Sequence, residues 1–164
     1  MKISSSIVAL GTLLLLAVNT LAEPLLLVVE DNRLPGFPLY LAVYAETGDQ
    51  WLAEPVARKK VILPEAEQFT LPMSLPSARY AIRAFIDLNH NTRLDTSRRE
   101  RPIEPFAHSA GDNRKRGSHN FQRSVFTLDE AGQQISLTLR YPKKALETLK
   151  SRETLKSLET SANQ

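Results

Sequence analysis

The sequence contains no cysteine among its 164 residues, which excludes disulfides and a lipid-attachment cysteine. An exported form would therefore depend on its hydrophobic core for stability. A membrane-spanning run is also missing, because the apolar stretch at residues 7–18 is shorter than the roughly 20 residues that cross a bilayer. A strong excess of one charge is absent too: 21 Lys and Arg stand against 18 Asp and Glu. Such a balance argues against a dedicated nucleic-acid-binding protein.

The N-terminus has the three parts of a signal peptide. Lys2 provides the positive start and residues 7–18 the apolar core. Thr20-Leu21-Ala22 then places small residues at the third-last and last positions before a cut. We predict a signal peptide over residues 1–22, the alternative being a retained membrane anchor. Cleavage after Ala22 would leave 142 residues and remove one lysine, lowering the net charge from +3 to +2. The mature chain is then expected in the periplasm or secreted, with no transmembrane segment.

The region from 23 to 142 has the composition of one β-rich domain. Short apolar runs with period-two alternation are separated by turn residues, as in sandwiches and barrels. The pattern is clearest at residues 79–86 and 135–141, and Lys59 and Lys60 mark residues 56–63 as an edge strand. We predict an all-β fold, an antiparallel Ig-like or transthyretin-like β-sandwich of about seven strands. Its last two strands, 125–128 and 135–141, are expected to form a hairpin.

Residues 143–164 form a charged C-terminal tail with a different pattern. Leu146, Leu149, Leu155 and Leu158 are spaced by three, six and three, so they spiral around a helix instead of forming one stripe. The pattern predicts a marginal helix or a disordered tail outside the core, and truncation after Pro142 should change stability little. Docking of a partner on this tail is the alternative.

A run of oxygen-bearing side chains follows the strand that ends at Ile86. Positions one, three, five and nine of the run are Asp87, Asn89, Asn91 and Asp95, and the carbonyl of Arg93 occupies position seven. Calcium takes six to eight oxygen ligands, and alternate residues of a tight turn can direct theirs to one point. The spacing therefore predicts a weak calcium site, with calcium as the only candidate cofactor.

Two substitutions weaken that prediction. Thr92 occupies the position at which calcium loops have glycine, and Arg98 the position of their bidentate glutamate. The alternative is an Asx-rich turn whose side chains bond their own backbone. The sequence leaves both open.

Several segments together resemble a known bacterial family. Leu75-Pro76-Ser77-Ala78-Arg79-Tyr80 resembles the opening of a strand in transthyretin-like and collagen-adhesin B-type sandwiches. With the run from Asp87 to Asp95, and with Arg116-Gly117, Phe121, residues 125–128 and 135–141, the chain resembles the bacterial domain-of-unknown-function family 2141. The resemblance covers about residues 24–141. It implies a small exported all-β protein of a family without an established activity. The chain departs from the pattern at Ala78 and Thr92, where the family has glycine.

A basic segment at residues 98–123 is a second candidate site. It carries seven Lys and Arg against three acids, including the cluster Arg114-Lys115-Arg116. Such a cluster can clamp a phosphate or carboxylate, which predicts an anion site at these three residues. The alternative is a solvated face of the protein.

The same segment contains the residue types of a hydrolase but not their spacing. Ser109 and Ser118 occur with His108, His119 and Asp112, yet no nucleophile-elbow motif is present. The three histidines are 18 and 11 residues apart, which fits no compact zinc motif. We therefore predict no enzyme activity and no catalytic residue.

The sequence as a whole favours an exported, non-catalytic binding or interaction module with an unknown partner. That partner would be a protein or an anionic ligand in the periplasm, and not a nucleic acid. Two alternatives remain open: an anion- or polysaccharide-binding module that uses the basic segment 98–123, and an unrecognised hydrolase.

Overall fold

The computed structural model describes residues 22–46, 51–109 and 121–162. The chain forms eight strands and two helices in these ranges. In order they are β1 (Ala22–Glu30), β2 (Pro38–Ala45), β3 (Ala57–Ile62), β4 (Phe69–Pro76), β5 (Ala78–Ile86), β6 (Phe106–His108), α1 (Phe121–Ser124), β7 (Val125–Leu128), β8 (Gln133–Thr138) and α2 (Lys143–Ala162). Residues 1–21 of the predicted signal peptide lie outside the described ranges, so that prediction stays a prediction.

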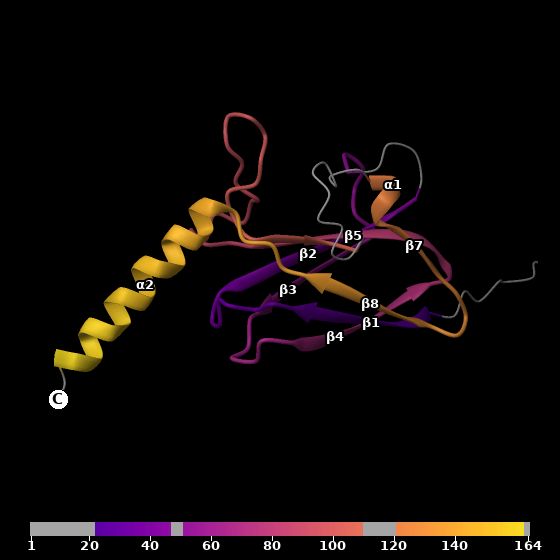
Figure 1. Cartoon of the computed structure of the whole chain (residues 1–164). Coiled ribbons are helices and arrows are strands. Elements are labelled where there is room, and N and C mark those ends of the chain that lie inside the picture. The colour runs from indigo at the N-terminus through magenta and orange to yellow at the C-terminus, as the bar shows by residue number, and fades with distance from the viewer. Residues whose placement is uncertain (1–21, 47–50, 110–120, 163–164) are drawn as a thin grey trace, which may run out of the picture.

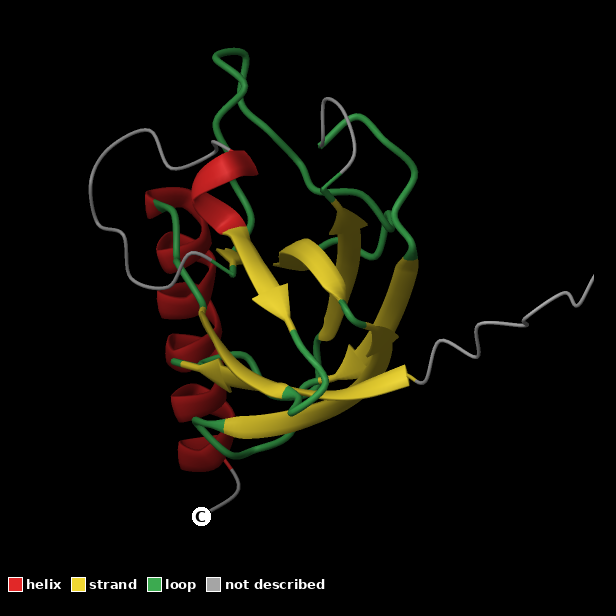
Figure 2. Ribbon diagram, turned by 90° about the vertical axis from the view of Figure 1, so that its right-hand side faces the viewer, coloured by secondary structure: helices red, strands yellow, loops and turns green. Residues whose placement is uncertain are grey.

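The strands form two sheets that face each other, as Figures 1 and 2 show. One sheet has the order β4-β1-β8, and the other has the order β3-β2-β5-β6, with β7 also paired to β5. The alternating apolar residues of both sheets meet between them in a single core, which includes Leu27, Val43, Ile82 and Leu137, all without solvent exposure. This arrangement is consistent with a β-sandwich and confirms the predicted all-β class, with eight strands where about seven were expected.

The predicted C-terminal hairpin is wrong. β7 pairs with β5 in the larger sheet, whereas β8 pairs with β1 in the smaller one. The turn at residues 129–132 therefore carries the chain from one sheet to the other. The pairing of β8 with β1 is also parallel, in a fold that is otherwise antiparallel among the named strands.

The predicted edge strand is confirmed at β3. It pairs only with β2 among the described strands, and its residues alternate between half-buried and exposed. Lys59 lies on the half-buried side and its Nζ donates to the carbonyl of Pro72 in β4, at 2.8 Å. A lysine directed inward at an edge hinders pairing with another chain.

The segment Leu75-Pro76-Ser77-Ala78-Arg79-Tyr80 has a structural role. The hydroxyl of Tyr80 donates to the carbonyl of Pro76, four residues upstream, at 2.8 Å. Tyr80 and Leu75 are both buried, so the bond fixes the chain where it passes from β4 to β5, in the manner of a tyrosine corner.

The tail forms a helix from Lys143 that leaves the sandwich (Figure 1). The expectation that it stays outside the core is wrong for its first turns, because Ala145 is fully buried and Leu149 packs against the core. These two positions are four residues apart and so share one face of the helix. In the described part of the chain, no helix is both long and apolar enough to cross a membrane.

Candidate functional site

The segment that follows β5 forms a tight turn around the carboxylate of Asp87. This side chain is fully buried where the chain leaves the sheet. One of its oxygens accepts the N–H of Asn91 at 3.1 Å, and the other accepts the N–H of Thr92 at 2.8 Å. Hydrogen bonds to a charged acceptor are stronger than those between neutral groups, so Asp87 holds the base of the turn.

The amide side chains of the turn converge on Asp95. Asn89 Nδ2 lies 2.7 Å from one carboxylate oxygen of Asp95, and Asn91 Nδ2 lies 3.0 Å from the other. The side-chain oxygens of Asn89 and Asn91 accept the backbone N–H groups of Asn91 and Arg93. Each asparagine thus closes an Asx turn two residues long. The structure brings the predicted side chains together, but as partners of one another and of the backbone.

Sequence reasoning missed one residue of this turn, Glu104. It is buried, and its two oxygens accept the N–H groups of Leu88 at 2.8 Å and Asp95 at 2.9 Å. Burial raises the pKa of the Glu104 carboxyl, with smaller contributions from the charges of Asp95 and Asp87, although the two backbone bonds act in the opposite direction. No regular spacing connects Glu104 to the turn, so the sequence contains no sign of this contact.

The turn also requires left-handed backbone conformations. His90 and Thr92 have φ of 61° and 64°. That region costs a residue with a side chain about 1–2 kcal/mol, and a β-branched residue is rare there. Thr92 therefore has the left-handed conformation that glycine has in calcium loops, although it carries a β-branched side chain.

The arrangement does not fit a calcium site as it stands. The oxygens of Asp87 and Glu104 face backbone N–H groups, and those of Asp95 face the amide nitrogens of the two asparagines. A cation needs these oxygens directed at one point. Among the residues that the structure describes, no three His, Asp or Glu side chains are grouped to hold a metal. The calcium prediction stays a prediction, and the geometry supports the Asx-turn alternative.

The predicted anion residues Arg114, Lys115 and Arg116 lie outside the described ranges, as do Asp112, Ser118 and His119. His108 and Ser109 are described. His108 is buried and its ring packs against those of Trp51 and Phe106, with centroids 5.5 and 5.6 Å away. The hydroxyl of Ser109 accepts the N–H of Ile82 and donates to the carbonyl of Ser124. Both hydrogen-bonding functions of this serine are thus used by the backbone.

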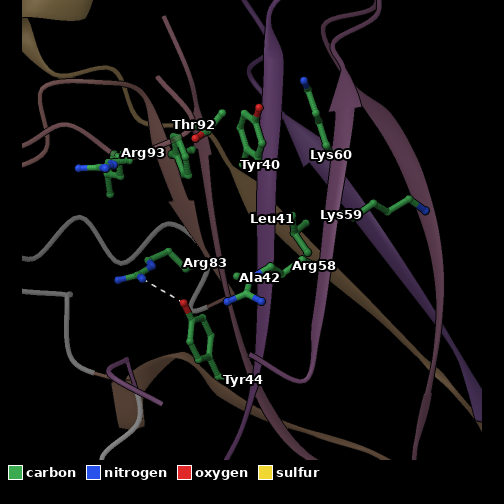
Figure 3. Close-up of a pocket in the computed structure, with 12 residues that line it drawn as sticks. Tyr40, Leu41, Ala42, Tyr44, Arg58, Lys59, Lys60, Arg83, Thr92 and Arg93 are labelled. Carbon is green, nitrogen blue, oxygen red and sulfur yellow. Dashed lines mark hydrogen bonds between the residues drawn. The ribbon is translucent and has the colours of Figure 1, made fainter. Parts of the chain in front are cut away.

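The outer face of the larger sheet contains a groove of about 420 Å³ that the sequence did not predict. Figure 3 shows its lining, which comes from β2, β3, β5 and the end of the turn. Ala42 lies on β2 at the same level as Arg58 on β3 and Arg83 on β5, because each arginine is its register partner. The small side chain of Ala42 leaves an open space between the two arginines.

Aromatic side chains lie on both sides of Ala42 along β2. Tyr40 stacks on its register partner Phe85 with centroids 5.3 Å apart, and Lys60 Nζ lies 5.3 Å from the Tyr40 ring. On the other side, Arg83 donates to the hydroxyl of Tyr44 at 3.0 Å, a bond drawn in Figure 3. The guanidinium of Arg83 also lies 5.5 Å from the Tyr44 ring. Cation–π contacts of this kind hold a cation in place without neutralising it.

The groove is basic and lacks acids. Five of its lining residues are Lys or Arg, and none of the described lining residues is Asp or Glu. Lys59 contributes no charge to it, because its side chain points away (Figure 3). Arg58 pairs with Glu54 at 2.7 Å, but both side chains are largely exposed, so the pair is weak. Lys60, Arg83 and Arg93 form no ion pair with a described carboxylate.

Comparison with known proteins identifies a family but no activity. No curated protein and no solved structure matches the chain. A family model described as "Uncharacterized protein conserved in bacteria (DUF2141)" matches residues 37–136, which contain the turn, the groove and both central strands of the larger sheet. The chain therefore belongs to this family of uncharacterized bacterial proteins, as its sequence motifs had indicated.

Proposed function

We propose that the protein is an exported, non-catalytic binding module whose groove on the β3-β2-β5 face holds an anionic ligand. The observation that carries the proposal is the lining of the groove. Four cationic side chains, those of Arg58, Lys60, Arg83 and Arg93, lie around it, and no acid lies among its described lining residues. A structural ion-pair network would interleave both signs.

The position of Arg83 distinguishes the groove from an ordinary solvated face. Its side chain is half-buried and lies 5.2 Å from the Trp51 ring as well as against Tyr44. Removing a guanidinium from water is costly unless a counter-charge compensates. An anion at the level of Ala42 would supply that counter-charge to Arg83 and Arg58 together, and Arg can bind such a group through two parallel hydrogen bonds.

Export is supported by the pattern of residues 1–22. A non-catalytic role is proposed for Ser109, because its hydroxyl is bonded to the backbone N–H of Ile82 and the carbonyl of Ser124. The anion site proposed here lies on the sheet, whereas the sequence pattern predicted it in the basic segment 98–123. That segment remains the second candidate, because it contains Arg98, Arg99 and Arg101 on the described surface.

A matched pair of variants separates the two sites. The first replaces Arg58, Lys60 and Arg93 by Gln, and the second replaces Arg98, Arg99 and Arg101 by Gln. All six side chains are exposed, and both variants lose three positive charges. Retention on immobilised heparin at low ionic strength is the measurement, with melting temperature as the test of folding.

We expect the groove variant to lose most of the retention and the second variant to keep most of it. Equal losses would mean that only net charge matters. A larger loss in the second variant would assign the site to the basic segment instead.

A further inference from the structure

A second cavity of about 210 Å³ adjoins the basic groove, and Arg83 and Leu94 line both. The rest of its lining has a different character, because it includes the rings of Trp51, Phe106 and His108 together with Pro102. The basic groove and this aromatic cavity are therefore neighbouring compartments with one arginine between them.

The strand register explains why the two compartments are continuous. Arg83 on β5 is paired with His108 on β6, and Phe85 is paired with Phe106. The positions of β5 that line the basic groove therefore have register partners on β6, and these partners are the aromatic residues His108 and Phe106. Neighbouring strands lie about 4.8 Å apart, so the two compartments, which are one or two strands apart, are separated by about 5–10 Å.

We infer that the ligand is an amphipathic anion: its negatively charged head group lies between Arg58 and Arg83, and a flat apolar body lies in the aromatic cavity against Trp51 and Phe106. This inference rests on the proposed function and adds the chemical class of the ligand. Four cationic side chains lie around the groove, whereas aromatic side chains dominate the second cavity and Arg83, at the boundary, is its one cation among the described lining residues. This division matches a molecule with a negatively charged end and a flat apolar end.

The size and the remaining charge of the aromatic cavity support a body of this kind. A protein cavity of about 150 Å³ holds benzene, so about 210 Å³ accommodates one aromatic ring. The cavity also contains Glu100, the one carboxylate among its described lining residues. A second negative group on the ligand would meet this carboxylate, which selects against molecules that are charged at both ends.

Trp51 provides a direct readout, because it is the only tryptophan in the chain and lies in the aromatic cavity. The experiment titrates the full mature protein with three probes: inorganic phosphate, phenyl phosphate and benzyl alcohol. Inorganic phosphate represents the charged head group alone, phenyl phosphate the head group joined to an aromatic body, and benzyl alcohol an aromatic body without charge. Trp51 emission and calorimetric heat are recorded for each.

We expect phenyl phosphate to bind about tenfold more tightly than phosphate and to change Trp51 emission, since burying a ring adds hydrophobic free energy. Benzyl alcohol should bind more weakly than phenyl phosphate. Replacing Thr96 by Phe would fill the aromatic cavity from its exposed rim, and should remove the advantage of phenyl phosphate while phosphate still binds. Thr127→Phe, at an exposed position on β7, is the matched control and should change neither affinity.

The outcomes separate this inference from the proposed function. Equal affinities for phosphate and phenyl phosphate would overturn the amphipathic ligand and leave the anion site intact. An advantage of phenyl phosphate that survives in Thr96→Phe would also overturn it, because the body would then lie elsewhere. Benzyl alcohol binding as tightly as phenyl phosphate would overturn both, since the charge would contribute nothing.

Discussion

The turn after β5 and the groove beside it are adjacent, and Thr92, Arg93 and Leu94 belong to both. They use charged side chains in opposite ways. In the turn, the carboxylates of Asp87, Asp95 and Glu104 each accept hydrogen bonds from the chain. In the groove, the half-buried guanidinium of Arg83 contacts a tyrosine hydroxyl and two aromatic faces but forms no ion pair with a described carboxylate.

This difference indicates which charges serve the fold and which are open to a ligand. Buried polar groups that are fully bonded within the chain contribute to stability and gain little from an outside partner. Charges gathered at one place without counter-charges gain from an anion in solution. On this reasoning the turn serves the fold and positions Arg93 and Leu94 at the end of the groove.

The largest expected effect comes from removing the centre of the turn. Asp87→Ala leaves the N–H of Thr92 without its acceptor and the N–H of Asn91 with only the 3.2 Å bond to Asn89 Oδ1, and should lower the free energy of unfolding by about 2–4 kcal/mol. Urea denaturation measures the change. Asp129→Ala is the control, because Asp129 makes a similar bond to the N–H of Ala131 at an exposed turn. If the free energy of unfolding fell by the same small amount in both variants, the hydrogen bonds of Asp87 would not stabilise the turn.

A second variant would give the groove the acid that it lacks. Ala42→Asp places a carboxylate between Arg58 and Arg83, its register partners. It should weaken anion binding by about tenfold or more, because the new carboxylate repels the ligand and pairs with both arginines. Ala42→Asn has the same shape without the charge and should bind more tightly than Ala42→Asp. Unchanged heparin retention in Ala42→Asp would place the anion elsewhere.

Thr92 allows the two regions to be separated at a residue that they share. Thr92→Gly removes the side chain from a residue with φ of 64°, and should raise the free energy of unfolding by about 0.5–1 kcal/mol. The groove should bind anions as before, because its charges are untouched. His90→Gly is the comparison: it relieves a φ of 61° but loses the stacking of His90 on Phe37, so its gain should be smaller. A loss of stability in Thr92→Gly would show that its side chain supports the turn.

The sequence predicts where individual strands lie along the chain better than it predicts which strands pair with one another. Alternation along residues 79–86 and 135–141 identifies which side of each strand is buried, and the structure confirms it. The pattern does not say which strand lies alongside, so the hairpin at residues 129–132 was predicted wrongly. The groove escaped prediction for the same reason, since Arg58, Ala42 and Arg83 meet only through the register of three strands. The turn was predicted from local spacing, except for Glu104, which reaches it from a later segment.

The smallest expected effect is a dependence of stability on pH that belongs to the turn alone. The pKa of Glu104 is raised above its ordinary value of 4.5, chiefly because burial penalises the charged form. The folded state therefore binds this proton more tightly than the unfolded state does. The stability that this provides is fully present below about pH 4.5 and is lost as the pH rises through the raised pKa. Glu104→Gln cannot titrate at this position.

Comparing unfolding of the wild type and Glu104→Gln in urea at pH 7 and pH 5 isolates the contribution, because the other carboxyl groups are common to both proteins. The wild type should gain stability relative to the variant at the lower pH. Anion binding in the groove should not follow the same dependence, since arginine and lysine remain charged over this range. A relative loss at pH 5 would mean that the two backbone bonds to Glu104 outweigh its burial. A parallel change in anion binding would mean that the turn and the groove are coupled through Arg93 and Leu94, instead of acting as separate parts of one surface.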